Sequence, residues 1–88
     1  MAYAVLVNVT FTDDEAAKAA LEPVVIPQTK SQAGFQTGYW CHGGDGTGMS
    51  FQVYDTKANA DEAAAAAKTA PPIVVIDSVK VFEVRGQA

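Results

Sequence analysis

The chain is poor in the residue types on which most reactive and most charged sites depend. One cysteine, one histidine and one tryptophan occur among 88 residues, and the six basic residues are scattered singly. A single cysteine excludes an internal disulfide framework and fits a reducing compartment. The formal net charge of -4, without a basic cluster, argues against nucleic acid and anionic membrane surfaces as partners.

Long apolar runs are also missing. The apolar segment Met1–Phe11 is stopped by the polar residues Thr12–Glu15, well short of the ~20 residues that a membrane-spanning helix needs. No basic segment precedes an apolar one, as it would in a secretory signal. We therefore expect a cytoplasmic protein with no membrane partner.

Cysteine and histidine, the usual ligands of structural zinc, are equally scarce. Cys41 and His42 are the only residues of their kinds, and as neighbours on a predicted strand they point to opposite faces. A structural zinc site needs four ligands, and a nucleophilic Cys–His pair needs both side chains on one side. We therefore predict no metal site and no cofactor, and interpret Cys41 as a small buried hydrophobic residue.

What the chain does contain is apolar surface, with 49% hydrophobic and 18% charged residues. Its length suits one domain, residues 1–88. A domain of this size leaves roughly a third or more of its unfolded surface exposed, so its core is small. A second copy of the chain would cover the surplus, which predicts a homodimer or an assembly of dimers.

The hydrophobic pattern divides the chain into six elements. Alternating β-branched and aromatic residues predict strands, and apolar residues at helical spacing predict helices. The expected elements are a strand over Tyr3–Phe11, a helix over about Asp13–Lys30, strands over Phe35–His42 and Met49–Tyr54, a helix over about Lys57–Thr69 that breaks at Ala70–Pro72, and a strand within Ile73–Val84. This order predicts an α+β fold of the ferredoxin-like βαββαβ type, a four-stranded antiparallel sheet with two helices on one face.

Both expected helices carry local signals. Thr12 or Asp13 is a suitable N-cap for the first helix. Pro23 and Pro27 lie inside it and each removes a backbone donor, so we expect a kink or two abutting pieces. The alanine run at residues 63–67 predicts that the second helix lies close to a sheet of bulky side chains.

The faces of the sheet differ in the sequence pattern. Odd-numbered residues of the first three strands are almost all apolar, and the even-numbered residues are mixed. The mixed set contains Leu6, Asn8, Gln36, Trp40, His42, Gln52 and Tyr54, joined by Phe82. We interpret the odd-numbered residues as lying under the helices and the mixed set as facing the second copy, because a solvent-facing sheet would not gather so many aromatic residues.

The stretch Gly38–Gly48, GYWCHGGDGTG, contains the only tryptophan, cysteine and histidine. A phosphate-binding loop is excluded because such a loop follows a strand and opens a helix, whereas this one joins two strands. Asp-Gly between alternating segments is typical of a β-hairpin.

Two polar residues invite a functional interpretation. His42 is either a solvent-touched strand-end residue or an acid or base in a pocket. Asn8, an amide in the most apolar strand, is either a structural residue partnered by Gln52 or water, or a donor that holds a substrate carbonyl or a peroxide.

Two segments carry a resemblance that covers nearly the whole chain, Ala33–Trp40 (AGFQTGYW) and Met49–Thr56 (MSFQVYDT). With the order of elements and the proline inside the first helix, they resemble the antibiotic biosynthesis monooxygenase-like family of the dimeric α+β barrel superfamily, in particular its short, uncharacterised bacterial members. The resemblance implies a homodimeric barrel. These motifs are specific for the fold and only weakly specific for an activity.

The family includes cofactor-independent oxygenases of quinol substrates and haem-degrading oxygenases. The haem-degrading members use an asparagine on the first strand, which Asn8 matches, and a tryptophan near the end of the third, where Tyr54 stands. Their iron-binding histidine has no counterpart between Lys57 and Thr69. We therefore expect no specific haem binding. In those relatives the asparagine faces the cleft between sheet and helices, whereas the alternation above directs Asn8 to the partner.

Two functions from different classes remain. The first is a cofactor-free monooxygenase acting on an aromatic phenol or quinol, with Asn8, His42 and Tyr54 as candidate catalytic residues. Its candidate substrate-binding residues are Trp40, Gln52 and Phe82. The second is a non-catalytic homodimer that binds a small ligand or serves as a structural module. A pocket of at least ~300 Å³ lined by these residues would favour the enzyme, and a solidly packed core would favour the module.

Overall fold

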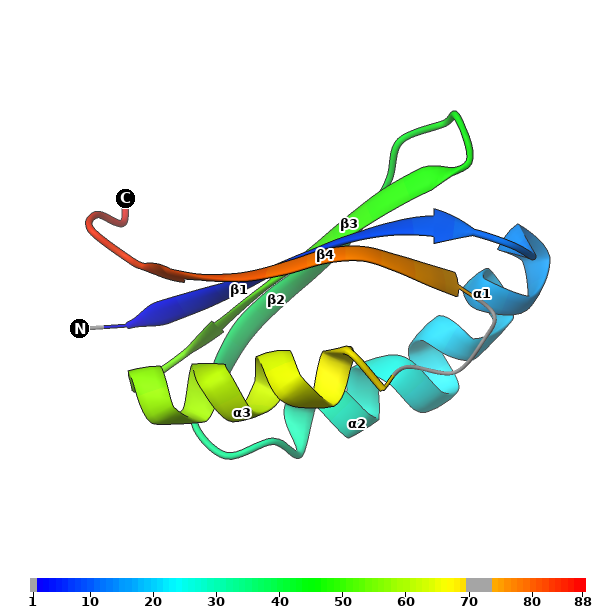
Figure 1. The fold of residues 1–88 in the computed structure, drawn as a ribbon. Helices are drawn as coiled ribbons and strands as arrows, with labels where there is room; N and C mark the ends of the chain where they lie inside the picture. Colours follow the sequence, from blue (N-terminus) through cyan, green and yellow to red (C-terminus); the bar gives the residue numbers. More distant parts are fainter. Residues whose placement is uncertain (1, 70–73) are drawn as a thin grey trace.

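The computed structural model describes residues 2–69 and 74–88 and has an α+β architecture (Figure 1). Its sheet is four-stranded and antiparallel, with the strand order β2-β3-β1-β4. The strands are β1 (Tyr3–Phe11), β2 (Phe35–His42), β3 (Thr47–Tyr54) and β4 (Val74–Glu83). The predicted α+β class and antiparallel sheet are confirmed, and the arrangement is consistent with the ferredoxin-like type.

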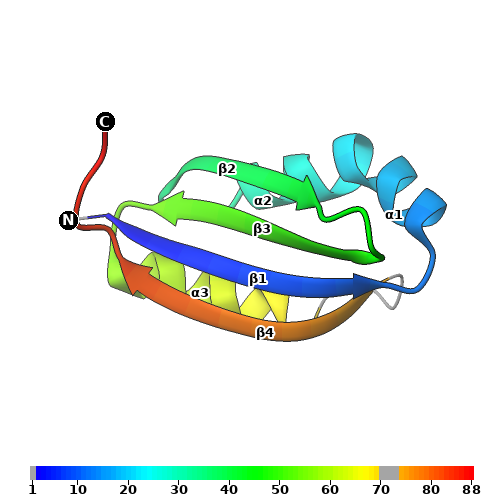
Figure 2. The same cartoon turned by 90° about the horizontal axis from the view of Figure 1, so that it is seen from above.

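The helical segments lie beneath one face of this sheet (Figures 1 and 2). The first segment consists of α1 (Asp14–Ala20), η1 (Leu21–Val25) and α2 (Ile26–Lys30), and the second is α3 (Lys57–Ala67). Seen from above, α3 runs under β1 and β4, whereas the first segment lies beside β2 (Figure 2). The side of the sheet that faces the helices is called the helix face below, and the other side the open face.

The first helical segment is interrupted as its prolines predict. The Asp13 carboxylate accepts a hydrogen bond from the Ala16 N–H at 3.0 Å and caps the start of α1. Pro23 lies within η1, a π-helical turn in which the Ile26 N–H donates to the Leu21 carbonyl. The wider turn accommodates a residue that lacks a donor, and Pro27 follows at the start of α2. The interruption therefore divides the helix into three pieces.

Helix α3 packs closely against the sheet because its contact residues are small. Ala60, Ala63 and Ala64 are buried in one cluster with Val5 and Val7 of β1. The Thr56 hydroxyl accepts from the Asn59 N–H at 3.2 Å and caps the helix. The prediction that the alanine run lies close to bulky strand residues is confirmed. The predicted break at Ala70–Pro72 and the predicted strand residue Ile73 lie outside the described residues.

The register of the strands corrects the predicted faces. Odd-numbered residues of β1 stand opposite even-numbered residues of β3, for example Val5 opposite Gln52 and Tyr3 opposite Tyr54. Residues opposite one another point to the same face. Grouping the odd-numbered residues of the first three strands on one face was therefore wrong. The helix face carries the valines of β1 together with Trp40, His42, Gln52 and Tyr54.

The open face still presents apolar side chains, although they differ from those expected. Two rows of residues cross the sheet on this side. One row is Tyr39, Phe51, Leu6 and Lys80, and the next is Thr37, Val53, Ala4 and Phe82. Tyr39 is 65% exposed and Phe82 is 38% exposed. No element among the described residues covers this face (Figure 1).

The loop between β2 and β3 is a hairpin, as its Asp-Gly pair predicts. Gly44 and Gly46 adopt φ values of 84° and 85°, the left-handed region that glycine enters without strain. The Asp45 carboxylate accepts from the hydroxyl of Thr47 and, at 3.2 Å, from its N–H. These hydrogen bonds lower the pKa of the Asp45 carboxyl, since they favour the charged form.

Within residues 2–69 and 74–88, no helix combines the length and the apolar character that crossing a membrane requires.

Candidate functional site

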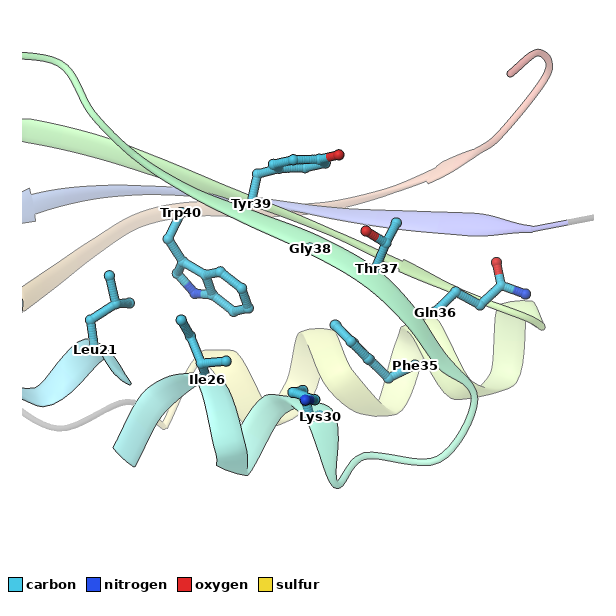
Figure 3. Close-up of a pocket in the computed structure, with 9 residues that line it drawn as sticks. All are labelled: Leu21, Ile26, Lys30, Phe35, Gln36, Thr37, Gly38, Tyr39 and Trp40. Atoms are coloured by element: carbon cyan, nitrogen blue, oxygen red, sulfur yellow. The ribbon is translucent and has the colours of Figure 1, made fainter. Parts of the chain in front are cut away.

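A cleft of about 450 Å³ separates the first helical segment from the edge strand β2. Figure 3 shows four apolar side chains that point into it, from both walls. Leu21 and Ile26 come from the helical side, and Phe35 and Trp40 come from the sheet. This volume lies in the range typical of small-molecule sites, and apolar and aromatic walls are their usual lining.

The cleft exists because the two helical segments pack differently. Helix α3 has small residues and lies directly on β1 and β4. The first segment carries the bulkier Leu21 and Ile26 toward the sheet and lies beside β2, an edge strand. Side chains of this size hold the two layers apart, and among the described residues no further strand pairs with the outer edge of β2.

Gly38 contributes space to the sheet side of the cleft. A Cβ atom at this position would lie 3.2 Å from the Gln52 Cγ and 3.2 Å from the Trp40 indole. Both distances are shorter than ordinary van der Waals contact. The missing side chain therefore leaves room for the indole and for Gln52, which is 6% exposed.

The cleft is lined by few polar side chains, and its only charged lining residue is basic. Its lining residues are Leu21, Ile26, Lys30, Phe35, Gln36, Thr37, Gly38, Tyr39 and Trp40. None of them is acidic, and Lys30 is their only basic member. Figure 3 shows the side chains of Tyr39 and Thr37 directed away from the cleft.

Tyr54, a candidate catalytic residue, lies on the helix face outside the cleft lining. Its ring is 1% exposed and packs edge-on against Phe35, with centroids 5.9 Å apart. Its hydroxyl donates to the Gln32 Oε1 at 2.5 Å, which ties β3 to the turn after α2. Burial raises the pKa of the Tyr54 phenol, because the phenolate would be poorly solvated.

His42, the second candidate, links the hairpin to the start of the first helix. Its Nδ1 accepts from the Gly44 N–H at 2.9 Å, and its Nε2 lies 3.3 Å from the Asp14 carboxylate. The ring stacks on Phe11 with centroids 5.2 Å apart and an angle of 8°. His42 and Tyr54 stand at opposite ends of the β2–β3 hairpin and are not brought together.

Asn8 and Phe82 lie on the open face, away from both His42 and the cleft. The Asn8 amide donates to the Ser78 hydroxyl at 3.0 Å. The predicted orientation of Asn8 away from the helices is confirmed, but its protein partner is Ser78 rather than Gln52. The Lys80 ammonium lies over the Phe82 ring, 5.0 Å from the ring centroid. The candidate residues thus form two groups on opposite sides of the sheet.

Of the six candidates, Trp40 alone lines the cleft, and Gln52 lies next to it. Sequence reasoning missed Leu21, Ile26, Lys30 and Phe35 as functional residues. The signal for the first two was present, since bulky apolar residues on the first helix contrast with the alanines of α3. Lys30 and Phe35 come together only through the turn between α2 and β2, which no periodicity reveals.

Cys41 corrects a further expectation. Its side chain is exposed, opposite Met49 on the open face, and is not part of the core. In residues 2–69 and 74–88, no three residues of the His, Cys, Asp and Glu types gather in a way that could hold a metal ion.

Comparisons with family models, with curated proteins and with solved structures found no match to this chain.

Proposed function

We propose that the protein is a small-ligand-binding homodimer whose ligand is an apolar, aromatic molecule held in the cleft between the first helical segment and β2. The observation that carries this proposal is the cleft itself. Two aliphatic and two aromatic side chains converge on a space of about 450 Å³ (Figure 3). Apolar walls exclude water, and an aromatic ligand stacked on Trp40 would gain both burial and ring contact.

Binding is better supported than catalysis by the polar groups around the cleft. Proton transfer needs a titratable group within hydrogen-bond reach of the reacting atom. Asn8, His42 and Tyr54 do not line the cleft, and the hydroxyl of Tyr54 is already bonded to Gln32. The two predicted functions therefore separate here, and the geometry favours the non-catalytic ligand-binding module.

The homodimer is the second part of the proposal. Apolar side chains cross the open face of the sheet, and the helices cover only the other face (Figure 1). Exposed rings such as Tyr39, at 65%, are typical of surfaces that a protein partner covers. A second copy packed sheet to sheet buries them, as the resemblance to dimeric α+β barrels implies.

The fluorescence of Trp40 offers a direct test, because the chain contains no other tryptophan. Titration with 4-phenylbutanamide, a neutral aromatic probe, is expected to change the emission saturably. Ile26→Gln places an amide in the apolar wall and should weaken binding about tenfold, since burying an unpaired amide costs about 1–3 kcal/mol.

Val24→Gln is the matched control for this titration. Val24 lies in the same helical segment but is 53% exposed and outside the cleft lining. The control should bind the probe as the wild-type protein does. An emission that stays unchanged up to the solubility limit of the probe would contradict the proposed function.

A further inference from the structure

The charge around the cleft differs from that of the whole chain. The chain has a formal net charge of -4, yet the residues that line the cleft include one lysine and no carboxylate. A cleft with low-dielectric walls concentrates the field of the charges at its rim. Lys30 is the only charged residue of the lining, and its ammonium favours a negative group in the cleft.

Lys30 is also available for a ligand. The side chain is exposed, and it has no hydrogen bond or ion pair within the described part of the chain. Three other basic residues of the chain are engaged. Lys57 pairs with Asp61 at 2.8 Å, Arg85 pairs with Glu83 at 2.9 Å, and Lys80 lies over the Phe82 ring.

The position of Lys30 relative to the apolar walls defines the shape of a ligand. Lys30 and Ile26 are one helical turn apart on α2, so both side chains lie on the side of the helix that faces β2. Phe35 and Trp40 form the opposite wall (Figure 3). A molecule that fits this arrangement has a ring between the walls and an anionic group at the exposed end.

We propose that the ligand of the cleft is an organic anion, an aryl- or arylalkylcarboxylate whose ring lies between Ile26 and Trp40 and whose carboxylate pairs with Lys30. This inference rests on the proposed function and adds the chemical class of the ligand. A lysine ammonium is a flexible point charge with three donors, so it recognises a carboxylate without demanding a fixed geometry.

Two probes of the same size test the contribution of charge. They are 4-phenylbutyrate and its neutral amide, 4-phenylbutanamide, each titrated into the full chain with Trp40 emission as the readout. We expect the acid to bind roughly fivefold more tightly than the amide, the scale of one solvent-exposed ion pair. The advantage should shrink as salt is added, because ions screen exposed charges.

Substitution of Lys30 identifies the counter-charge. Lys30→Gln should remove the advantage of the acid and leave the affinity for the amide unchanged. Lys68→Gln is the matched control, since Lys68 is an exposed lysine that follows the other helical segment and does not line the cleft. It removes the same charge and should preserve the preference for the acid.

Each outcome decides between the two proposals. Equal affinities for acid and amide in the wild-type protein, or equal losses in both lysine variants, would overturn the anion while leaving the ligand-binding cleft in place. If neither probe changes the emission of Trp40, the cleft is not a site for such molecules and both proposals fail.

Discussion

The hydroxyl of Tyr54 shows how one residue can combine a polar group with a core position. Its ring is buried among the valines of β1 and the alanines of α3, and its oxygen reaches Gln32 in the turn after α2. A buried phenol with one good partner contributes to stability chiefly by avoiding an unsatisfied polar group. This position explains a tyrosine at the end of β3 without any catalytic role.

Titration of the tyrosines by alkali tests this environment. The raised pKa of Tyr54 predicts a phenolate that forms later than the ordinary value of about 10. Ultraviolet absorbance should resolve a late component among the three tyrosines, and Tyr54→Phe should remove it. The control Tyr39→Phe should leave the late component in place.

The same shift has a consequence for stability. A group whose pKa is raised by folding stabilises the folded state below its unfolded pKa, and this contribution is lost as the pH rises through the folded pKa. The wild-type protein should therefore lose stability above about pH 10, and Tyr54→Phe should lose less over that interval. A late component that persists in Tyr54→Phe would contradict the assignment.

The hydrogen-bond partners of His42 and Asn8 could not be predicted from the sequence. His42 and Asn8 stand out by type, yet one is bonded to Gly44 and close to Asp14, and the other is bonded to Ser78 on the opposite side of the sheet. Their partners are distant in sequence or belong to loops. Chemical type alone therefore drew attention to polar residues, while the cleft depends on apolar ones.

At the scale of elements, the local signals were sufficient for most boundaries. The strands Tyr3–Phe11 and Phe35–His42 begin and end where alternation predicts, and Pro23 marks the π-helical turn. The local signals were not sufficient to assign the faces of the sheet. Alternation within a strand says which residues share a side, but only the pairing of Tyr3 with Tyr54 relates one strand to the next. This register is set by contacts between residues that are far apart in the sequence.

Gly48 of β3 lies where the backbone of β2 and the ring of Phe11 come close to it. A Cβ at this position would lie 2.7 Å from the Cys41 carbonyl oxygen and 2.7 Å from the ring of Phe11, which in turn stacks on His42. Gly48→Ala must therefore displace backbone as well as a ring. We expect a loss of about 1–3 kcal/mol, typical of overpacking.

Thermal unfolding followed by circular dichroism measures this loss. For a domain of this size each kcal/mol lowers the Tm by roughly 4–8 °C. Gly86→Ala serves as the control, because a Cβ there meets nothing within 4 Å. Equal Tm values for Gly48→Ala and the wild-type protein would show that β2, β3 and Phe11 are not in such close contact.

At the scale of the whole molecule, the two faces of the sheet differ in whether helices cover them. The helix face holds a small core in which α3 is pressed against β1, together with a cleft on the side of β2. The open face holds a second apolar layer with no cover from residues 2–69 and 74–88 (Figure 1). An 88-residue chain that leaves such a layer in water forgoes much of the burial available to it.

The proposed homodimer is tested at the centre of that layer. Phe51 lies on β3, directly between Tyr39 of β2 and Leu6 of β1. Phe51→Glu would bury an unpaired carboxylate in the middle of a sheet-to-sheet interface, and we expect the dimer Kd to rise at least about a hundredfold. Sedimentation equilibrium at micromolar concentration should then give a dimer for the wild-type protein and a monomer for the variant.

Val24→Glu is the control, since Val24 is exposed and belongs to η1, in the helical segment beneath the other face of the sheet. It adds the same charge and should remain dimeric. Because the cleft lies on the helix face, dissociation of Phe51→Glu should leave the Trp40 response to 4-phenylbutanamide intact. A wild-type monomer would refute the dimer, whereas a monomeric variant without the Trp40 response would show that the partner helps to form the cleft.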